Sequence, residues 1–125
     1  MEEQHKYLTW EQFDSVCKEI HIWAKDKKFN SIYGPPRGGL VLAVKLSHLL
    51  EIPLIVSKDD ITPRTLIVDD ITDTGKTMEK FRQKGNKIAT IFYHKQSTVI
   101  PDKWFFEKTD KWVIYPWENS ENINS

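Results

Sequence analysis

The feature that most constrains this chain is the run TLIVDDITDTGKT at residues 65–77. Its first four residues predict a buried strand, and two carboxylates, Asp69 and Asp70, follow directly. A turn rich in threonine and glycine then opens a helix predicted over residues 74–83. In an open α/β sheet, ligands bind beyond the carboxyl ends of the strands, and a helix N-terminus holds phosphate well. The run therefore predicts a phosphate loop beside two acids that suit sugar hydroxyls and a hydrated Mg²⁺.

Other interpretations of this run explain it less well. Gly75-Lys76-Thr77 matches the end of a Walker A loop, but that loop needs a glycine five residues earlier, where this chain has Asp70. A response-regulator-like signalling domain also clusters Asp, Thr and Lys. Its acidic pair would follow an early strand, whereas Asp69 and Asp70 lie past the middle of the chain. A tight turn with a helix cap is the purely structural alternative.

The remaining pattern predicts a single α/β domain. The pair Thr9 and Gln12 forms a capping-box pattern, and apolar residues behind it recur at helical spacing, which predicts a helix over about 10–27. Strands are then expected at 31–33, 53–56, 65–68 and 88–93, with helices at about 40–50 and 74–83. Such alternation is typical of a mostly parallel sheet covered by helices. Two aromatic-rich pieces within residues 96–118 predict a small appendage on the sheet edge.

Composition excludes several classes of protein. A chain of 125 residues with 39% hydrophobic and 29% charged residues has the composition of one ordinary globular domain. Eighteen basic residues balance eighteen acidic ones, which argues against nucleic-acid binding, although a local basic patch is compatible with that balance. Cys17 is the single cysteine and lies among apolar residues, so we expect a buried structural thiol. The sequence has neither a signal-peptide pattern nor a membrane-spanning apolar run, which predicts a cytoplasmic protein without a membrane partner.

A second loop agrees with a phosphate site. The sequence GPPRGG at residues 34–39 follows the strand predicted at 31–33. Glycines let the backbone approach a ligand closely, and the guanidinium of Arg37 suits pyrophosphate. By itself this segment is equally a turn with a solvated arginine. Because both loops follow parallel strands, we expect residues 34–40 and 69–77 to lie side by side.

Taken together, these motifs resemble the type I phosphoribosyltransferases. Residues 65–77 look like the motif by which that family binds 5-phosphoribosyl-1-pyrophosphate (PRPP), and DITDTGKTM is especially similar to the hypoxanthine-guanine enzymes. WVIYPWE at residues 112–118 is similar to the C-terminal signature of bacterial and archaeal xanthine/hypoxanthine-guanine phosphoribosyltransferases. The resemblance implies one parallel-sheet phosphoribosyltransferase domain over residues 1–125, with a core at about 29–95 and a C-terminal hood at about 96–118.

The resemblance also implies an activity. It is the Mg²⁺-dependent transfer of the 5-phosphoribosyl group from PRPP to a 6-oxopurine (guanine, xanthine or hypoxanthine), which yields a nucleoside monophosphate and pyrophosphate. Family members commonly pair, and five Trp and six Phe are hard to bury in so small a core. We therefore expect a homodimer.

Roles carry over to matching positions in the two loops. Asp69 and Asp70 would contact the ribose 2- and 3-hydroxyls, and Asp70 would also lie near Mg²⁺. Asp73 would face N7 of the purine and is the candidate catalytic residue for proton transfer. The other PRPP-binding residues implied are Arg37, Gly38, Thr74, Gly75, Lys76 and Thr77. The family's pyrophosphate loop contains a cis peptide before its basic residue, which here would be the Pro36–Arg37 bond.

The base would be bound by the C-terminal third of the chain. By the resemblance, Trp112 would stack on the purine and the Val113 backbone would bond its edge. A lysine after the preceding strand would read the 6-oxo group. Lys95 is the candidate, but His94 occupies that position if no residue is inserted.

The connection between the second and third expected strands departs from the family pattern. Family enzymes carry a long mobile loop there, which closes over pyrophosphate and excludes water. Here only KDDITPR, residues 58–64, is available, with Lys58 or Arg64 as partial substitutes. The alternative hypothesis is therefore a regulatory protein of the same fold that binds PRPP or a nucleotide and catalyses little or no transfer.

Overall fold

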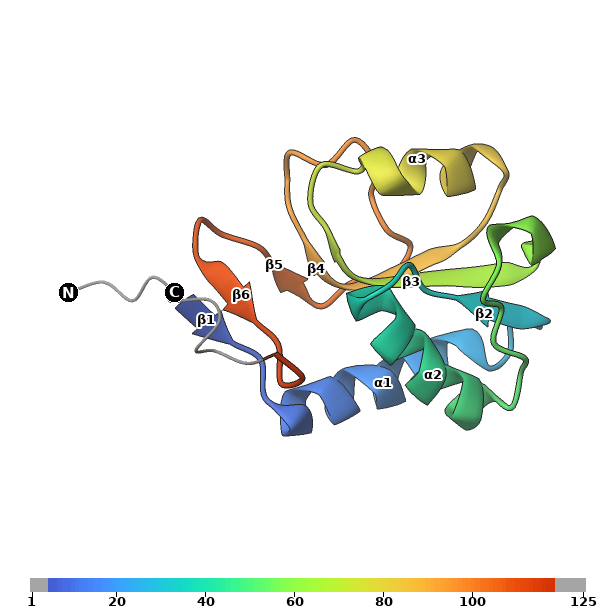
Figure 1. The fold of residues 1–125 in the computed structure, drawn as a ribbon, viewed down its shortest axis with the longest axis horizontal. Coiled ribbons are helices and arrows are strands. Elements are labelled where there is room, and N and C mark those ends of the chain that lie inside the picture. Colours follow the sequence, from blue (N-terminus) through green and yellow to red (C-terminus); the bar gives the residue numbers. More distant parts are fainter. Residues whose placement is uncertain (1–4, 119–125) are drawn as a thin grey trace.

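The computed structural model describes residues 5–118 and shows strands and helices that alternate along the chain (Figure 1). The helices are α1 (Trp10–Ala24), α2 (Gly38–Leu50) and α3 (Lys76–Gln83), with a short 3₁₀ turn, η1 (Lys58–Asp60). The strands are β1 (His5–Tyr7), β2 (Ser31–Tyr33), β3 (Thr65–Thr72), β4 (Ile88–Tyr93), β5 (Phe106–Glu107) and β6 (Trp112–Ile114).

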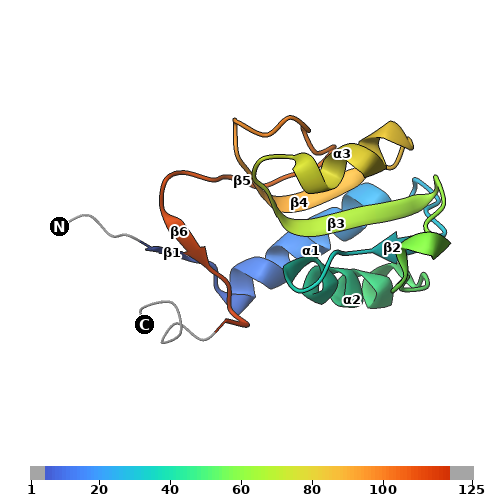
Figure 2. The same cartoon turned by 45° about the horizontal axis from the view of Figure 1, so that its top comes forward.

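The main sheet is parallel and has the strand order β2-β3-β4-β5. Helices α1 and α2 cover one face, and α3 covers the other (Figures 1 and 2). Parallel strands need crossover connections, and here helices supply those from β2 to β3 and from β3 to β4. The α/β fold expected from the sequence is therefore confirmed.

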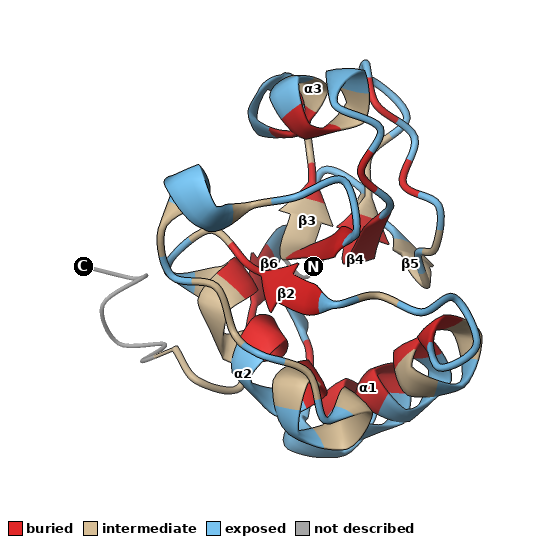
Figure 3. Cartoon of the chain, turned by 90° about the vertical axis from the view of Figure 1, so that its right-hand side faces the viewer, coloured by how far each residue is buried: buried red, intermediate tan, exposed pale blue. Residues whose placement is uncertain are grey.

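Buried apolar residues lie on both faces of this sheet. Figure 3 shows the buried segments of the strands and helices in red. On the α1/α2 face, Ile20 and Leu46 are fully buried against β3 and β4. On the other face, α3 packs through Met78 and Phe81. Cys17 is fully buried on α1, and this burial raises the pKa of its thiol to about 12. The expected structural thiol is confirmed, because such a group stays protonated at neutral pH.

Several element boundaries differ from the sequence-based expectations. The capping box at Thr9 and Gln12 is present, but α1 ends at Ala24, and the expected last turn is a non-helical turn that ends in the left-handed region at Lys28 (φ 59°). The prediction of a strand at 53–56 is wrong, because this segment forms a single isolated parallel bridge, between Leu54 and Ile32. Strand β3 continues four residues past its expected end because its pairing with β4 runs to Thr72.

The C-terminal segment divides between two sheets. β5 joins the edge of the main sheet, whereas β6 pairs in parallel with β1, an N-terminal strand that the sequence did not predict. Stacked and edge-to-face rings tie this small sheet to the body of the molecule. Tyr115 and Trp117 stack at 5.0 Å, and Trp117 meets Phe13 of α1 at 5.5 Å. Within residues 5–118, no helix is long and apolar enough to cross a membrane.

Asn86 offers a test of how the start of β3 is held. Its buried amide donates to the carbonyls of Thr62 (2.8 Å) and Thr65 (2.9 Å). We expect Asn86→Ala to lower the free energy of unfolding by about 2–4 kcal/mol, because two covered carbonyls lose their donor. Urea denaturation measures this loss. The exposed Gln83→Ala on α3 serves as control and should change stability by less than about 0.5 kcal/mol. Equal stability of the two variants would contradict the assigned role.

Candidate ligand-binding site

The two loops singled out in the sequence meet at the carboxyl ends of adjacent strands β2 and β3. A side chain on Gly38 would collide with the carboxylate of Asp70. One on Gly39 would lie 2.9 Å from the Val68 carbonyl oxygen and 3.1 Å from Asp69 Oδ1. Only glycine permits this approach, so the expectation that the loops lie side by side is confirmed.

Asp69 and Asp70 form a strongly interacting pair at the end of β3. The backbone N–H of Asp70 donates to Asp69 Oδ1 at 2.8 Å. Burial raises the pKa of Asp69 well above its usual range, and the neighbouring Asp70 carboxyl raises it further by hydrogen bonding and by charge. Two close carboxylates that resist simultaneous ionisation favour a cation or several hydroxyl donors as ligand.

A cleft of about 200 Å³ follows the acid pair along the turn into α3. The turn passes through Gly75, whose φ of 89° suits glycine and which has no side chain to cap α3. The N–H of Lys76, the first residue of α3, donates to the Thr74 hydroxyl at 3.3 Å. The residues lining the cleft are Asp69, Ile71, Thr72, Asp73, Thr74, Gly75, Thr77 and Met78. A helix N-terminus, hydroxyls and a glycine turn together suit a phosphate group.

A third loop, at residues 94–98, completes this side of the site. Only His94 and Lys95 of this loop were considered as site residues from the sequence. Gln96 Nε2 lies 3.3 Å from Asp73 Oδ1. The Thr98 N–H donates to the Thr74 carbonyl at 3.0 Å, and the Thr98 hydroxyl donates to Glu79 at 2.7 Å. The 94–98 loop thus supports the turn into α3 and contacts Asp73. Polar residues directly after β4 were the available sequence signal.

The residues predicted to contact the purine base lie in two segments, the loop after β4 and strand β6. Lys95 is highly exposed, and its ammonium lies 3.3 Å from Glu107 Oε1. His94 Nδ1 accepts a hydrogen bond from the Gln96 N–H at 3.1 Å. Trp112 is 60% exposed at the start of β6, whereas the adjacent Val113 is buried. The roles given to Lys95, Trp112 and Val113 stay predictions.

The segment carrying β6 lies close enough to the acids to feel their charge. Tyr115 is buried, and its hydroxyl has no hydrogen-bond partner among the described residues. Burial raises the pKa of Tyr115, and the charges of Asp70 and Asp69 raise it further. The residue that follows β6 therefore lies within the electrostatic reach of the acids of β3.

Arg37 is exposed at the start of α2, and the Pro36–Arg37 peptide is cis, as the resemblance implies. The last residue of the 57–64 connection, Arg64, is bonded at other positions. The Arg64 guanidinium donates to the Lys28 carbonyl, and the Asn30 N–H donates to the Arg64 carbonyl at 3.1 Å. Arg64 is thereby held at the amino ends of β2 and β3, opposite the cleft.

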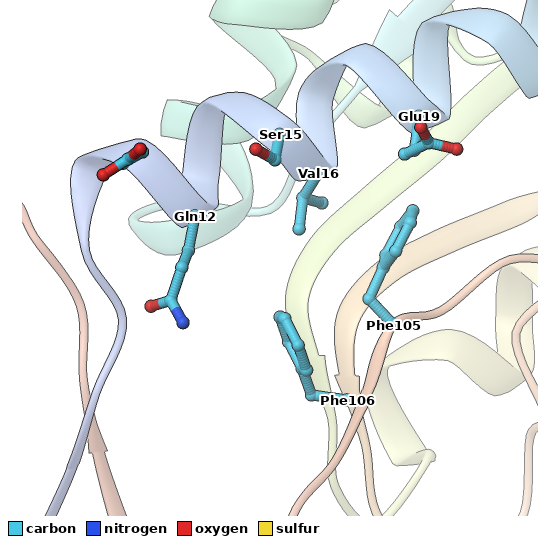
Figure 4. A pocket seen from close by; sticks show the side chains of 7 residues that line it. Gln12, Ser15, Val16, Glu19, Phe105 and Phe106 are labelled. Carbon is cyan, nitrogen blue, oxygen red and sulfur yellow. The ribbon is translucent and has the colours of Figure 1, made fainter.

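A larger cavity, of about 340 Å³, lies between α1 and the chain entering β5 (Figure 4). Its walls are the carboxylates of Glu11 and Glu19, polar groups of α1, and the rings of Phe105 and Phe106. None of the described residues that line it is basic and two are carboxylates, so it suits an anion poorly. The smaller cleft at the turn into α3 is therefore the candidate site.

Comparison with known proteins agrees with this geometry. No protein-family model matches the chain. A xanthine-guanine phosphoribosyltransferase from Desulfotalea psychrophila is 26% identical over 150 residues, which cover 98% of this chain and 94% of that protein. A purine phosphoribosyltransferase structure from Pyrococcus horikoshii is 33% identical with a TM-score of 0.77, over 93% of this chain and 95% of that one. The Helicobacter pylori xanthine-guanine-hypoxanthine phosphoribosyltransferase shares the fold, with a TM-score of 0.79 at 18% identity, over 98% and 99% of the two chains.

The acid pair predicts a pH-dependent stability. A carboxyl whose pKa is raised by folding binds its proton more tightly in the folded protein, so its favourable contribution is complete only below the unfolded pKa of about 3.9 and is lost as pH rises through the folded pKa. At pH 7 the raised pKa of Asp69 should therefore lower the stability of the ligand-free protein. We expect Asp69→Asn to unfold at higher urea concentration than wild type at pH 7.

The advantage of Asp69→Asn should shrink as the pH falls toward 4. Urea titrations across this range, in buffer with a metal chelator, measure it. Asp110→Asn, an exposed carboxylate distant in sequence from the pair, is the matched control. An Asp69→Asn advantage that stays constant with pH would refute this account of the pair.

Proposed function

Because the chain belongs to the type I phosphoribosyltransferase family, we propose that it transfers the 5-phosphoribosyl group of PRPP to a 6-oxopurine. The observation that carries this proposal is the contact of the Gly38–Gly39 backbone with Asp69 and Asp70. It brings a loop suited to pyrophosphate, through Arg37, against acids suited to a ribose. The cleft suited to a 5-phosphate lies next along the chain.

Each part of PRPP then has a matching group in the protein. The 5-phosphate would lie at the start of α3, against the N–H groups and hydroxyls of residues 74–77 and the Lys76 ammonium. Asp69 and Asp70 would accept hydrogen bonds from the ribose hydroxyls. Arg37 and the backbone around Gly38 would hold the pyrophosphate and stabilise the negative charge that develops as it leaves.

Mg²⁺ fits the same acids. The described residues include no group of three or more His, Cys, Asp or Glu side chains arranged around a metal. Mg²⁺ commonly takes one or two carboxylates and completes its shell with water and substrate phosphates, so the Asp69/Asp70 pair is a sufficient donor set, with Asp70 as the ligand. When bound, Mg²⁺ would neutralise charge on the leaving pyrophosphate.

The chemical step exchanges two bonds at the ribose. The C1–oxygen bond to pyrophosphate breaks with its electron pair, and purine N9 bonds to C1. The purine imidazole proton must leave in the same process, and Asp73 would accept it at N7, supported by the contact of its carboxylate with Gln96. Trp112 would stack on the base and hold it in line, with the Val113 backbone and Lys95 at its edge.

One observation favours a second candidate, a regulatory protein that binds PRPP or a nucleotide without efficient transfer. The 57–64 connection is short, and its Arg64 is bonded at the far end of the sheet. With no lid drawn from this segment, bound pyrophosphate would stay open to water. Ground-state affinity would then survive better than turnover, because closure-dependent stabilisation is missing.

Calorimetry with PRPP and Mg²⁺, followed by an assay of base-dependent pyrophosphate release, tests the proposal. Asp70→Asn and Thr77→Ala should each weaken PRPP binding about tenfold or more, the equivalent of about 1.4 kcal/mol, without unfolding the protein. Thr109→Ala, an exposed threonine in a loop between β5 and β6, is the matched control. Unchanged affinity in both site variants would remove the two residues from the site.

The release assay separates the two candidates. Guanine, xanthine and hypoxanthine should each be compared with adenine. Release with an oxopurine supports the enzyme and its base class, and release with adenine alone would overturn the 6-oxopurine assignment. PRPP binding with no release for any base would favour the regulatory protein.

We also propose that the protein forms a homodimer. Large apolar side chains remain exposed on the single chain, among them Tyr7, Trp10 and Trp112, each more than half exposed. Sedimentation should show a dimer at micromolar concentration. A clean monomer across that range would count against the proposal.

A further inference from the structure

The amino edge of the main sheet is strongly basic, although the whole chain is neutral. The residues directly before the strands, at 25–30, 63–64, 84–87 and 102–105, converge on this edge because the strands are parallel. They include seven basic residues (Lys25, Lys27, Lys28, Arg64, Lys84, Lys87 and Lys103) but only two acidic ones (Asp26 and Asp102). Figure 3 looks onto this edge, whose connections are largely exposed. The proposed reaction uses none of these residues.

An open cleft of about 480 Å³ lies within this basic edge, between the end of α1 and the start of β4. We call it the basic cleft, and it is lined by Trp23, Lys27, Phe29, Lys87 and Asp102. The rings of Trp23 and Phe29 are half-buried, with centroids 6.1 Å apart and planes inclined by 38°. A partly exposed aromatic pair of this kind provides an apolar wall for a flat ring.

Two ammonium groups belong to the same cleft. Lys27 Nζ lies over the Trp23 ring, 4.9 Å from its centroid, so the exposed Lys27 side chain must move aside for a base to contact that face. Lys87 Nζ lies 4.0 Å from Asp102 Oδ1, and its side chain is more than half exposed. Asp102 is held elsewhere, since its Oδ2 accepts from the Ile88 N–H (2.8 Å) and from Arg82 (2.9 Å). The Lys87 ammonium is thus only loosely paired, and both lysines can meet an anionic group.

We propose that the basic cleft binds a nucleoside phosphate, at a second site separate from the acid end of β3. The base would lie against Trp23 and Phe29, and Lys27 and Lys87 would pair with the phosphate. The cleft volume lies in the range of small-molecule sites. A free nucleotide fits better than a long nucleic acid, because the chain is neutral overall and a carboxylate, Asp102, forms part of the wall. This site does not depend on the proposed reaction.

Titration of the full chain with GMP, followed by ¹H–¹⁵N NMR, tests the second site. The Trp23 indole N–H reports on the basic cleft, and the backbone N–H groups of residues 74–77 report separately on the other site. We expect the Trp23 signal to move with millimolar or tighter affinity. The double variant Lys27→Gln/Lys87→Gln should weaken that response at least tenfold while the 74–77 response is unchanged. Lys18→Gln, an exposed lysine elsewhere on α1, is the matched control.

Three further ligands decide the chemistry of the site. Guanosine and inorganic phosphate should each bind the basic cleft more weakly than GMP, because each lacks half of the recognised groups. Raising the salt concentration should weaken GMP binding, since the lysines are exposed. Phosphate as tight as GMP would reduce the cleft to a charged patch and overturn the proposal, as would a Trp23 signal that never moves. A short single-stranded RNA that binds far more tightly than GMP would overturn the free nucleotide in favour of nucleic acid.

The two reporter regions belong to separate sites. Loss of the Trp23 response would therefore not contradict the proposed phosphoribosyl transfer. Loss of the 74–77 response likewise leaves the basic cleft untouched.

Discussion

The contact of the Gly38–Gly39 backbone with the end of β3 is the interaction on which the candidate site depends. Without side chains at these two positions, the start of α2 comes directly against Val68, Asp69 and Asp70. That approach covers the acid pair, which is why the pKa of Asp69 rises. It also sets the loop carrying Arg37 beside the turn that opens α3. The Arg37 loop, the acid pair and the turn into α3 match a ligand that has a polyol between two separated phosphate groups.

The direction of the strands distributes charge across the molecule. All strands of the main sheet are parallel, so the residues that follow them gather at one edge and the residues that precede them gather at the other. Asp69 and Asp70 lie in the second half of β3 and Asp73 follows it, whereas lysines precede β2, β4 and β5. The carboxyl edge of a neutral chain thereby combines these carboxylates with Arg37 and Lys76, and the amino edge is mainly basic. The mixed carboxyl edge suits a phosphorylated sugar with a cation, and the basic edge suits an anionic ligand.

Much of the site could be predicted because its signals are local. The strand, the two acids and the DTGKT turn are contiguous, so their order along the chain is also their order in space. The prediction of a strand at 53–56 failed because pairing with another strand is not a local property. Its apolar residues suit a strand, but its bonds to the main sheet are confined to Ile32, through the Pro53 carbonyl and the Ile55 N–H, before the chain leaves toward η1. Spacing likewise left open whether His94 or Lys95 meets a base, because a shift of one residue redirects a side chain.

The sequence by itself determined the elements whose cause lies within a few residues: the capping box at Thr9, the buried β3 with its two acids, and the glycine turn into α3. Only the tertiary structure decided which distant segments meet. It paired β1 with β6, set Gln96 against Asp73, and joined the end of α1 to the start of β4 in one cleft. These contacts depend on strand order and on packing across the whole core. Local propensity carries no information about either, because it is a property of neighbouring residues alone.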